Sequence, residues 1–337
     1  MVIAMACFVL PAHALSPDIR NNLRLGAQDF PPINQKQAAL GQKLFYDPIL
    51  SGNNNISCGV CHHHRLFGGD GLSLGLGEGG ENVGKDRTAG MGENRIKRRV
   101  PRNAPSLFNL GAKEIHTLFH DGRVRIHDLY GNGFSTPAEE FLPPSMQSLL
   151  AVQALFPIQS EIEMAGNSGE NEIAGARFER IDRAWDVLIA KLRAIPEYVT
   201  LFADAFDDVE DAGDIHIAHM GNAIGQFISG EWQSYDSPWD EYLAGNDDAL
   251  LASQKAGMAL FFGKGNCAQC HSGKLFSDQK FYNLAVPQFG PGRTRKFDPM
   301  PRDVGRMGFT DRLEDAYRFR TPPLRNVALT APYGHNG

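Results

Sequence analysis

A pentapeptide of the form C-x-x-C-H occurs twice in this chain and limits its chemistry more than any other feature. The copies run from Cys58 to His62 and from Cys267 to His271, and they use every cysteine except Cys7. Two thiols at this spacing can meet the two vinyl groups of one porphyrin, while the adjacent histidine ligates its iron. The motif therefore predicts two covalently bound c-type haems.

A C-x-x-C pair alone is also typical of a redox disulfide or of half a zinc site. The histidine after each pair favours haem, because a chain with five cysteines and eleven histidines rarely contains two such pentapeptides by chance. We predict that four cysteines attach the haems and that two histidines ligate iron. The attachment residues are Cys58, Cys61, Cys267 and Cys270, and the iron ligands are His62 and His271.

The composition is typical of an exported globular enzyme. Hydrophobic residues make up 42% and charged residues 21% of 337 positions, a length that allows two domains. Residues 1–10 are apolar but too few to span a bilayer, and Ala12-His13-Ala14 fits a cleavage site. We therefore predict a signal peptide over 1–14 and a soluble periplasmic protein without membrane insertion. The apolar run lacks the usual Lys or Arg, so we expect a misplaced or incomplete start.

The formal net charge is −6, and a field of this sign disfavours nucleic acid and favours small molecules and protein partners. A basic run over 95–102 is the local exception. It would suit an acidic donor protein or haem propionates, but we interpret it as a solvated loop.

Similar segments precede the two pentapeptides, beginning at Ala39 and at Ala256. Apolar residues recur at helical spacing in both, Leu40 with Leu44 and Ala256 with Leu260. Each segment is predicted to be an amphipathic helix that leads into a haem loop, which indicates two related haem domains.

Apolar spacing also predicts helices over 181–192 and 215–228, and Pro238 interrupts the chain after the second of them. We place the domain boundary there, with an N-terminal domain over 15–235 and a C-terminal domain over 236–337.

Ten glycines lie between residues 68 and 92. The stretch from Gly75 to Gly80 formally matches the G-x-G-x-x-G dinucleotide fingerprint, but no apolar strand precedes it and no amphipathic helix follows. We interpret it as a flexible loop near a haem face.

Six motifs in this chain carry a family resemblance. They are Leu40-Gly41 to Tyr46-Asp47-Pro48, Gly68-Gly69-Asp70, Pro101 to Pro105, Asp121-Gly122-Arg123, Pro157-Ile158-Gln159 to Glu163-Met164, and Leu324 to Tyr333. With them the chain resembles the bacterial dihaem cytochrome c peroxidases over nearly all of its length after the signal. It is also similar to the dihaem enzyme that matures the tryptophan tryptophylquinone of methylamine dehydrogenase. The resemblance implies a mostly α fold of two cytochrome c-like domains packed together, with long loops.

The resemblance also implies roles for individual residues. In the family the N-terminal haem meets peroxide and the C-terminal haem receives electrons and passes them on. Glu163 matches the family's distal glutamate, which moves a proton between the peroxide oxygens. Gln153 matches a glutamine that orients the ligand, and His335 matches a histidine near the interdomain haem face.

A calcium site between the domains is implied in the same way. Asn103 and the backbone carbonyls of Thr330 and Pro332 match the family's ligands, and oxygen ligation suits this cation. For Arg325 two roles remain open, pairing with a haem propionate and a structural salt bridge.

The chain departs from the family at two internal positions. Many of these peroxidases carry a histidine in the glycine-rich loop that caps the oxidised reactive haem, but no histidine occurs between His64 and His116. We therefore expect an open reactive haem that needs no prior reduction. His120 stands where family members commonly have tryptophan, and we expect it to be structural, because neutral imidazole readily bridges polar groups.

A third departure is that the chain stops at Gly337, where family members continue, so we expect the C-terminal domain to be incomplete. The methionine or tyrosine that ligates the second haem would then lie further on. Met300 and Met307 remain as internal candidates for that ligand.

These observations predict a peroxidase that reduces hydrogen peroxide to water with electrons from a small donor protein, such as a cytochrome c or cupredoxin. Two alternatives remain: an enzyme that uses peroxide to oxidise a protein side chain, and a dihaem electron carrier without catalysis. The family resemblance also suggests a homodimer.

Overall fold

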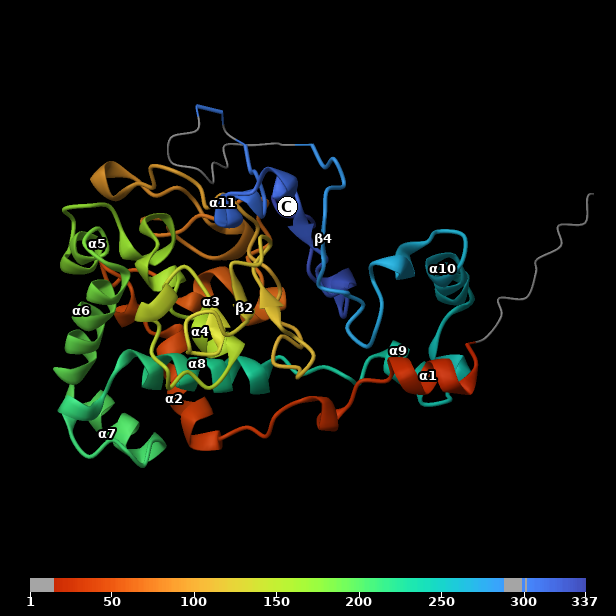
Figure 1. The fold of residues 1–337 in the computed structure, drawn as a ribbon, viewed down its shortest axis with the longest axis horizontal. Helices are drawn as coiled ribbons and strands as arrows, with labels where there is room; N and C mark the ends of the chain where they lie inside the picture. The colour runs from red at the N-terminus through yellow and green to blue at the C-terminus, as the bar shows by residue number, and fades with distance from the viewer. Residues whose placement is uncertain (1–14, 288–298, 301) are drawn as a thin grey trace, which may run out of the picture.

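The computed structural model describes residues 15–287, 299–300 and 302–337. The predicted signal peptide and Cys7 lie outside these residues. The described chain is mostly helical, as predicted, with two small antiparallel sheets. Figure 1 shows a larger lobe around α2, α4 and α8 and a smaller lobe with α1, α9 and α10.

Within the described residues, the elements have the following bounds. The helices are α1 (Pro17–Leu23), α2 (Gln35–Tyr46), α3 (Cys58–Cys61), α4 (Leu149–Gln153), α5 (Glu172–Ala176), α6 (Ile181–Arg193), α7 (Pro196–Ala205), α8 (Ile217–Glu231), α9 (Pro238–Leu243), α10 (Ala252–Phe262) and α11 (Met307–Thr310). The strands are β1 (Thr117–Leu118), β2 (Val124–Ile126), β3 (Phe134–Ser135), β4 (Phe281–Tyr282) and β5 (Phe319–Arg320).

Helix α8 is the centre of the larger lobe, and nearly all of its side chains are buried. Glycines allow its neighbours to approach closely. A Cβ on Gly41 of α2 would lie 1.9 Å from the carbonyl oxygen of Ala223, and one on Gly225 would lie 2.8 Å from the backbone nitrogen of Ala151 in α4. Side chains at these positions would force the helices apart. The helices predicted over 181–192 and 215–228 are confirmed as α6 and α8.

The two helices predicted ahead of the pentapeptides are also confirmed, as α2 and α10, but their apolar faces differ. In α2, Leu40 and Leu44 are 2% and 0% exposed. In α10, Leu260 is 57% exposed, Ala256 is exposed as well, and Met258 is the buried residue. The expectation that α10 buries the same face as α2 is therefore wrong for the described residues, because α8 covers α2 and has no counterpart over α10.

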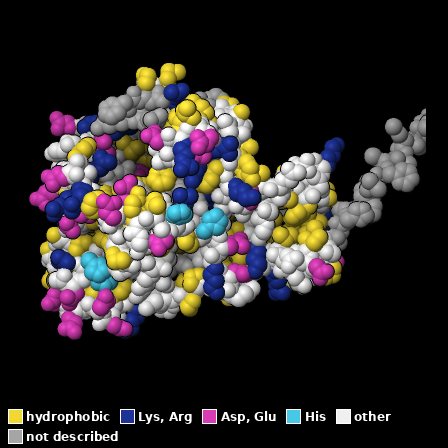
Figure 2. All heavy atoms as spheres, in the orientation of Figure 1, with side chains coloured by type: hydrophobic (Ala, Val, Ile, Leu, Met, Phe, Trp, Pro, Cys, Tyr) yellow, Lys and Arg dark blue, Asp and Glu magenta, His cyan; other side chains and the backbone are white. Residues whose placement is uncertain are grey.

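The smaller lobe has its own small core, formed by Leu23, Tyr242, Leu243, Leu250 and Met258. This core joins α1, from the start of the described chain, to segments after residue 236. Figure 2 shows hydrophobic side chains gathered on the visible surface of this lobe. The predicted domain boundary stays a prediction.

The two sheets lie where the C-terminal part of the chain returns to the larger lobe. Strand β2 pairs with β1 and β3, with Arg125 opposite Thr117, and β4 pairs with β5, with Phe281 opposite Arg320. A hydrogen bond of 2.8 Å from the Arg320 backbone to the His120 carbonyl connects the second sheet to the turn after β1.

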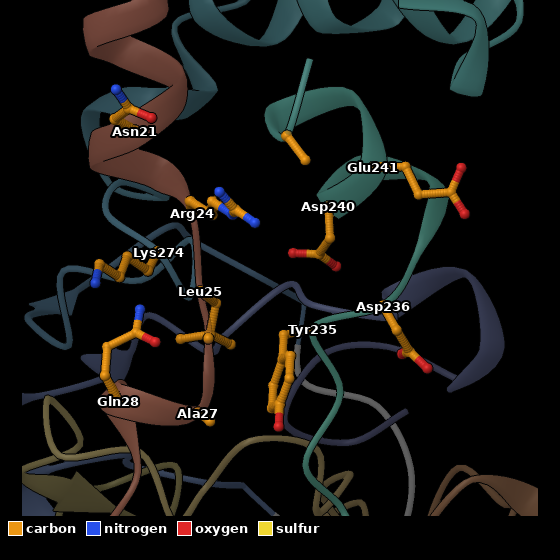
Figure 3. Close-up of a pocket in the computed structure, with 12 residues that line it drawn as sticks. Asn21, Arg24, Leu25, Ala27, Gln28, Tyr235, Asp236, Asp240, Glu241 and Lys274 are labelled. Carbon is orange, nitrogen blue, oxygen red and sulfur yellow. The ribbon is translucent and has the colours of Figure 1, made fainter. Parts of the chain in front are cut away.

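A cavity of about 610 Å³ lies at the junction of the lobes, where Figure 3 shows Tyr235, Asp240 and Lys274 around it. The Lys274 amine pairs with Asp29 at 2.5 Å. The buried Arg325 guanidinium pairs with the equally buried Asp240 carboxylate. Among the described residues Arg325 thus forms a structural salt bridge, one of the two roles left open.

Candidate functional site

The first pentapeptide forms one helical turn, α3, against the main core. The backbone N–H of His62 donates to the Cys58 carbonyl at 2.9 Å, which places the histidine directly after the turn. The first variable position must be glycine, because a Cβ on Gly59 would lie 2.3 Å from the ring of Tyr46. Tyr46 ends α2, so the helix predicted to lead into the haem loop touches the pentapeptide directly.

His62 is oriented as an iron ligand needs to be. Its Nδ1 lies 2.9 Å from the carbonyl oxygen of Gly68, so Nδ1 carries the proton and donates, and Nε2 keeps its lone pair. Burial lowers the pKa of His62, and the Gly68 contact and the charges of Asp70 and Glu163 oppose this only in part. The ring is therefore neutral, which is the form that binds a metal.

The thiols of the first pair are free, and both cysteines are half-buried. Burial raises the pKa of Cys58 to about 12, and burial together with the charge of Asp70 raises that of Cys61 to about 12. Such thiols are poor nucleophiles toward disulfides. They suit permanent attachment better than redox cycling, so these residues fit a covalent haem.

The second pentapeptide repeats this geometry in a different setting. The backbone N–H of His271 donates to the Cys267 carbonyl at 2.9 Å, and its Nδ1 lies 2.9 Å from the Phe276 carbonyl. Nε2 is again left for a metal. Cys267 is exposed, whereas Cys270 is half-buried. The residues at this site fit a second haem as well.

The two alternatives for the C-x-x-C pairs find no support among the described residues. All four described cysteines are free. In the described part of the chain, one group of three metal-ligating side chains lies close together: Asp208, His216 and His219. His219 Nδ1 accepts the backbone N–H of His216 at 3.2 Å, and its Nε2 lies 3.3 Å from Asp208. His219 therefore caps the start of α8.

Glu163 lies in a short π-helix over Glu161–Ala165, a type of turn often found at functional sites. Its side chain is half-buried. Its charge adds to the raised pKa of Cys61 and opposes the lowering of the pKa of His62, so the carboxylate is near the first pentapeptide. The same turn contacts the segment before that pentapeptide, because the Gly52 N–H donates to the Met164 carbonyl at 2.8 Å.

The glycine-rich segment is a loop, as predicted, and it packs directly against the Glu163 turn. The Glu78 N–H donates to the Glu163 carbonyl at 2.9 Å. A Cβ on Gly77 would lie 1.9 Å from the Ile162 carbonyl oxygen, so glycine is required for this contact. The Glu78 side chain is buried and accepts hydrogen bonds from Asn53 and Asn55 at 2.9 and 2.7 Å. Several contacts thus hold the loop, contrary to its description as flexible.

Two residues that hold this region were given no role from the sequence. The buried Arg87 guanidinium donates to the carbonyls of Leu76, Gly77 and Asn82 at 2.5, 2.7 and 2.6 Å. Asp70 is 1% exposed, and its Oδ2 has no hydrogen-bond partner among the described residues. Burial raises the pKa of Asp70, which the Leu72 N–H and the His62 charge offset in part.

The sequence gave little warning of either residue, since charged side chains are mostly exposed. For Asp70 one signal existed, its place in the Gly68-Gly69-Asp70 motif. Arg87 had none, because its partners are backbone carbonyls, which no side-chain pattern marks.

Gln153 is the last residue of α4, and its side chain is half-buried. Among the described residues its side-chain amide makes no hydrogen bond, which leaves it available to a ligand. The predicted roles of Gln153 and Glu163 remain predictions.

The residues predicted to bind calcium lie together in part. Asn103 Nδ2 donates to the Pro332 carbonyl at 2.9 Å, and Thr330 precedes Pro332 by two positions. A cation would need Oδ1 of Asn103 instead, which a rotation of about 180° about the Cβ–Cγ bond presents. The donors are oxygens of the kind that calcium prefers. Calcium remains a prediction.

His120 and His335 lie beside this site. His120 Nε2 is 3.3 Å from the Asn103 carbonyl oxygen, and the Asn103 N–H donates to the His335 carbonyl at 2.9 Å. Burial, with the charges of Arg102 and Arg320, lowers the pKa of His120 to about 3. The neutral, half-buried ring fits the structural role expected for it. His335 is 4% exposed and stacks on Phe319 with ring centroids 3.9 Å apart.

The basic run over 95–102 is not a continuous solvated loop. Arg102 is buried and pairs with Asp121 and Asp303, each at 2.6 Å, and these charges raise its pKa although burial opposes them. Lys97 and Arg98, in contrast, are exposed and pair with Glu170 and Glu161. Arg102 connects the larger lobe to the C-terminal segment, while the start of the run faces solvent.

No helix among the described residues is both long enough and apolar enough to cross a bilayer. Met300 and Met307 were the internal candidates for the sixth ligand of the second haem. Met300 is 58% exposed, and Met307 is the first residue of α11. Their role as ligands stays a prediction.

Known proteins resemble this chain over most of its length. The cytochrome c551 peroxidase of Pseudomonas aeruginosa is 31% identical over 91% of this chain and 69% of its own length. The cytochrome c peroxidase Ccp of Escherichia coli is 32% identical over 91% of this chain and 51% of its own. The methylamine utilization protein MauG of Methylorubrum extorquens is 27% identical over 91% of this chain and 66% of its own. The chain thus spans from about half to about two thirds of the length of these relatives.

Two solved structures share the fold. One is a MauG-like protein associated with microbial copper homeostasis, with 28% identity and a TM-score of 0.61 over 98% of this chain and 78% of that one. The other is the dihaem peroxidase BthA of Burkholderia thailandensis, with 23% identity and a TM-score of 0.62 over 96% of this chain and 71% of that one. The second likeness concerns the fold alone.

The family model of the di-haem cytochrome c peroxidases matches residues 35–248, more than half of the chain. This range includes the first pentapeptide, the glycine-rich loop and Glu163. The resemblance inferred from short motifs is confirmed: this protein belongs to the di-haem cytochrome c peroxidase family.

Proposed function

We propose that this protein is an exported, periplasmic dihaem peroxidase that reduces hydrogen peroxide to water with electrons from a small redox protein. The observation that carries the proposal is the position of Glu163, whose charge acts on Cys61 and His62 of the first pentapeptide. A half-buried carboxylate near the first pentapeptide can serve as the acid–base group that peroxide cleavage requires. Family membership and the named peroxidase relatives support the same reaction.

The haem at the first site would supply peroxide ligation and the two electrons that break the O–O bond. The chain's own residues handle protons and position. A carboxylate oxygen of Glu163 would accept one proton of hydrogen peroxide and return it to the oxygen that leaves as water. Hydrogen peroxide, two electrons and two protons then give two molecules of water. Gln153 orients the peroxide by donating a hydrogen bond.

His62 is held for its task by Gly68, because the Nδ1–carbonyl contact fixes both the tautomer and the plane of the ring. Arg87 and Glu78 fix the glycine-rich loop against the Glu163 turn. This loop carries no histidine. We therefore propose that the first haem keeps a free position and reacts with peroxide in the fully oxidised protein.

Replacing Glu163 with glutamine tests the acid–base role. Because glutamine keeps the shape but cannot carry the proton, we expect turnover with peroxide and a reduced donor to fall about 10²- to 10⁴-fold. The matched control is Glu161→Gln in the same π-helix, where the carboxylate pairs with Arg98 at 2.9 Å. Both variants should keep two haems by intact mass. Turnover of Glu163→Gln within about twofold of the control would refute the role.

The alternative activity, oxidation of a protein side chain, is favoured by the missing capping histidine and by the likeness to MauG. An optical titration of the oxidised protein with peroxide separates the candidates. Rapid return to the resting spectrum with a reduced cytochrome c or cupredoxin supports the peroxidase. A stable oxidised form that only a protein substrate discharges supports the alternative, and an unchanged spectrum indicates an electron carrier. A homodimer and a calcium ion remain further parts of the proposal.

A further inference from the structure

A second cavity, of about 430 Å³, opens between strand β2 and the two-stranded sheet of β4 and β5. Its charged lining consists of Arg125, Lys280, Arg306, Arg318 and a single carboxylate, Asp315. Four positive charges and one negative leave a local charge of +3, in a chain whose formal net charge is −6. The cavity is therefore positively charged although the molecule as a whole is negatively charged.

The single carboxylate is already engaged. Asp315 lies 3.6 Å from Arg306 and accepts a hydrogen bond from the Thr310 hydroxyl at 2.8 Å. Arg306 also donates to the Asp121 carbonyl at 3.2 Å and lies over the Phe281 ring, with its Cζ 4.0 Å from the ring centroid. These contacts hold the Arg306 side chain in place at the edge of the cavity.

The other three cations remain largely uncompensated. Arg125 Nε is sealed from solvent and has no hydrogen-bond partner among the described residues. Arg318 donates only weakly, to the Phe281 carbonyl at 3.4 Å. Lys280 is exposed at the mouth and forms no ion pair within the described part of the chain. Asp278, two positions away, is engaged by the Tyr282 hydroxyl at 2.7 Å and the Lys280 backbone N–H at 3.0 Å.

Arg125 is half-buried with one unpaired N–H, which is costly, and an oxyanion that contacts its guanidinium gains charge-assisted hydrogen bonds. The planar fork of arginine matches the oxygens of phosphate groups, and an ammonium at the mouth adds a flexible point charge. The volume lies within the range of small-ligand pockets and exceeds the needs of a single monovalent ion. Charge and size together select a multiply charged ligand.

We infer that this cavity binds a small, multiply charged oxyanion of the phosphate class, held by Arg125, Lys280 and Arg318. The site lies outside the two pentapeptides and the Glu163 turn. It lies between the sheet of β1, β2 and β3 and the sheet of β4 and β5, so the bound anion holds these two sheets together.

Calorimetric titration of the protein carrying both haems tests the site, with sodium pyrophosphate and inorganic phosphate as probes in a chloride buffer. We expect saturable binding of one pyrophosphate per chain, tighter than that of phosphate. Arg125→Gln and Lys280→Gln should each weaken pyrophosphate binding about tenfold or more, because each removes a charge-assisted contact. Lys280 is exposed, so its variant should fold normally, and two intact haem spectra check both variants.

The matched control is Lys97→Gln, which removes the same charge from the exposed basic run, where Lys97 pairs with Glu170 at 3.6 Å. It should leave the affinity within about twofold, because surface pairs at a distance contribute little. An equal loss in the control would mean general charge attraction and would overturn the site. Absence of saturable binding up to about 10 mM pyrophosphate would overturn the site too. The same result is expected if haem propionates already fill the cavity, and it would overturn the site in that case as well.

Discussion

The two C-x-x-C-H segments share their local structure and differ in their surroundings. In both, the histidine N–H donates to the first cysteine's carbonyl at 2.9 Å, and Nδ1 lies 2.9 Å from a later carbonyl. The first segment packs against the main core, where burial raises the pKa of both thiols to about 12. The second belongs to the smaller lobe, and Cys267 is exposed.

This contrast teaches that the pentapeptide sets the ligand geometry, while neighbouring segments set access and chemistry. The first segment has Glu163 and a fixed glycine-rich loop beside it, which suits a reaction with a small molecule. The second has an exposed cysteine and a helix, α10, whose Leu260 face is exposed among the described residues, which suits contact with another redox group. The following predictions test the contrast, from the largest expected effect to the smallest.

Removing one pair of thiols at a time should separate the two functions completely. We expect Cys58→Ala with Cys61→Ala to abolish the optical reaction with peroxide, because the haem beside Glu163 is lost. Cys267→Ala with Cys270→Ala should keep that reaction but lose turnover with a reduced donor. Intact mass must show one haem in each double variant. Identical behaviour of the two would contradict the proposed division.

Truncating equivalent leucines ahead of the two pentapeptides should have unequal effects on stability. Leu44 is fully buried in α2, so Leu44→Ala should lower the free energy of unfolding by about 2–5 kcal/mol. Leu260 in α10 is 57% exposed, so Leu260→Ala should change it by no more than about 0.5 kcal/mol. Urea unfolding followed by circular dichroism measures both. A loss above about 1 kcal/mol at Leu260 would show that this face is covered.

His120, where the lobe and the C-terminal segment meet, should make stability depend on pH. Its folded pKa of about 3 lies below the unfolded value of about 6.5, so the unfolded chain binds the extra proton. The stabilisation that neutral His120 contributes to the fold is therefore present above pH 6.5 and is lost as the pH falls toward 3. Between pH 7 and 4.5 it amounts to about 2–3 kcal/mol.

The variant His120→Phe should remove this part of the pH dependence. The free energy of unfolding in urea is measured for the wild type and the variant at pH 7 and at pH 4.5. Subtracting the pH effect in the variant from that in the wild type leaves the part due to His120, because the other titrating groups contribute equally to both. An unchanged pH dependence in the variant would mean that His120 is accessible to protons in the folded protein.

Glycines near the two pentapeptides should respond with opposite signs. Gly77→Ala forces a Cβ to within 1.9 Å of the Ile162 carbonyl, so we expect a loss of about 1–3 kcal/mol and lower peroxide reactivity. Gly257 lies within α10 with nothing within 4 Å of the added atom, so Gly257→Ala should gain about 0.5–1 kcal/mol. Thermal unfolding and peroxide titration of both variants check this, and similar effects would contradict the contrast.

Much of this architecture could be predicted from particular residues. The spacing of Leu40 with Leu44 predicted α2, and the apolar period predicted α6 and α8, because helical spacing records the face that a core will cover. The missing apolar strand before Gly75 correctly argued for a loop. The equal spacing of Ala256 and Leu260 misled in one respect, because periodicity reports a helix but not whether a partner covers it.

Parts of the candidate site had no sequence signal. Arg87 binds three carbonyls of a loop that is near it only in the folded chain. Asp70 became a buried acid beside His62 through packing. The cluster of Arg125, Lys280 and Arg318 draws on segments almost two hundred residues apart, so no local pattern revealed it.

The sequence by itself predicted where two haems would attach, which histidines would ligate their iron, and which helices precede the two pentapeptides. These features rest on covalent spacing and on hydrogen bonds within a few residues, which any chain with this pentapeptide can form. Only the tertiary structure decided that the first segment packs against the main core near Glu163 and that the second leaves Cys267 exposed. Burial and electrostatic fields come from residues distant in sequence, and the chain acquires them only when its core assembles.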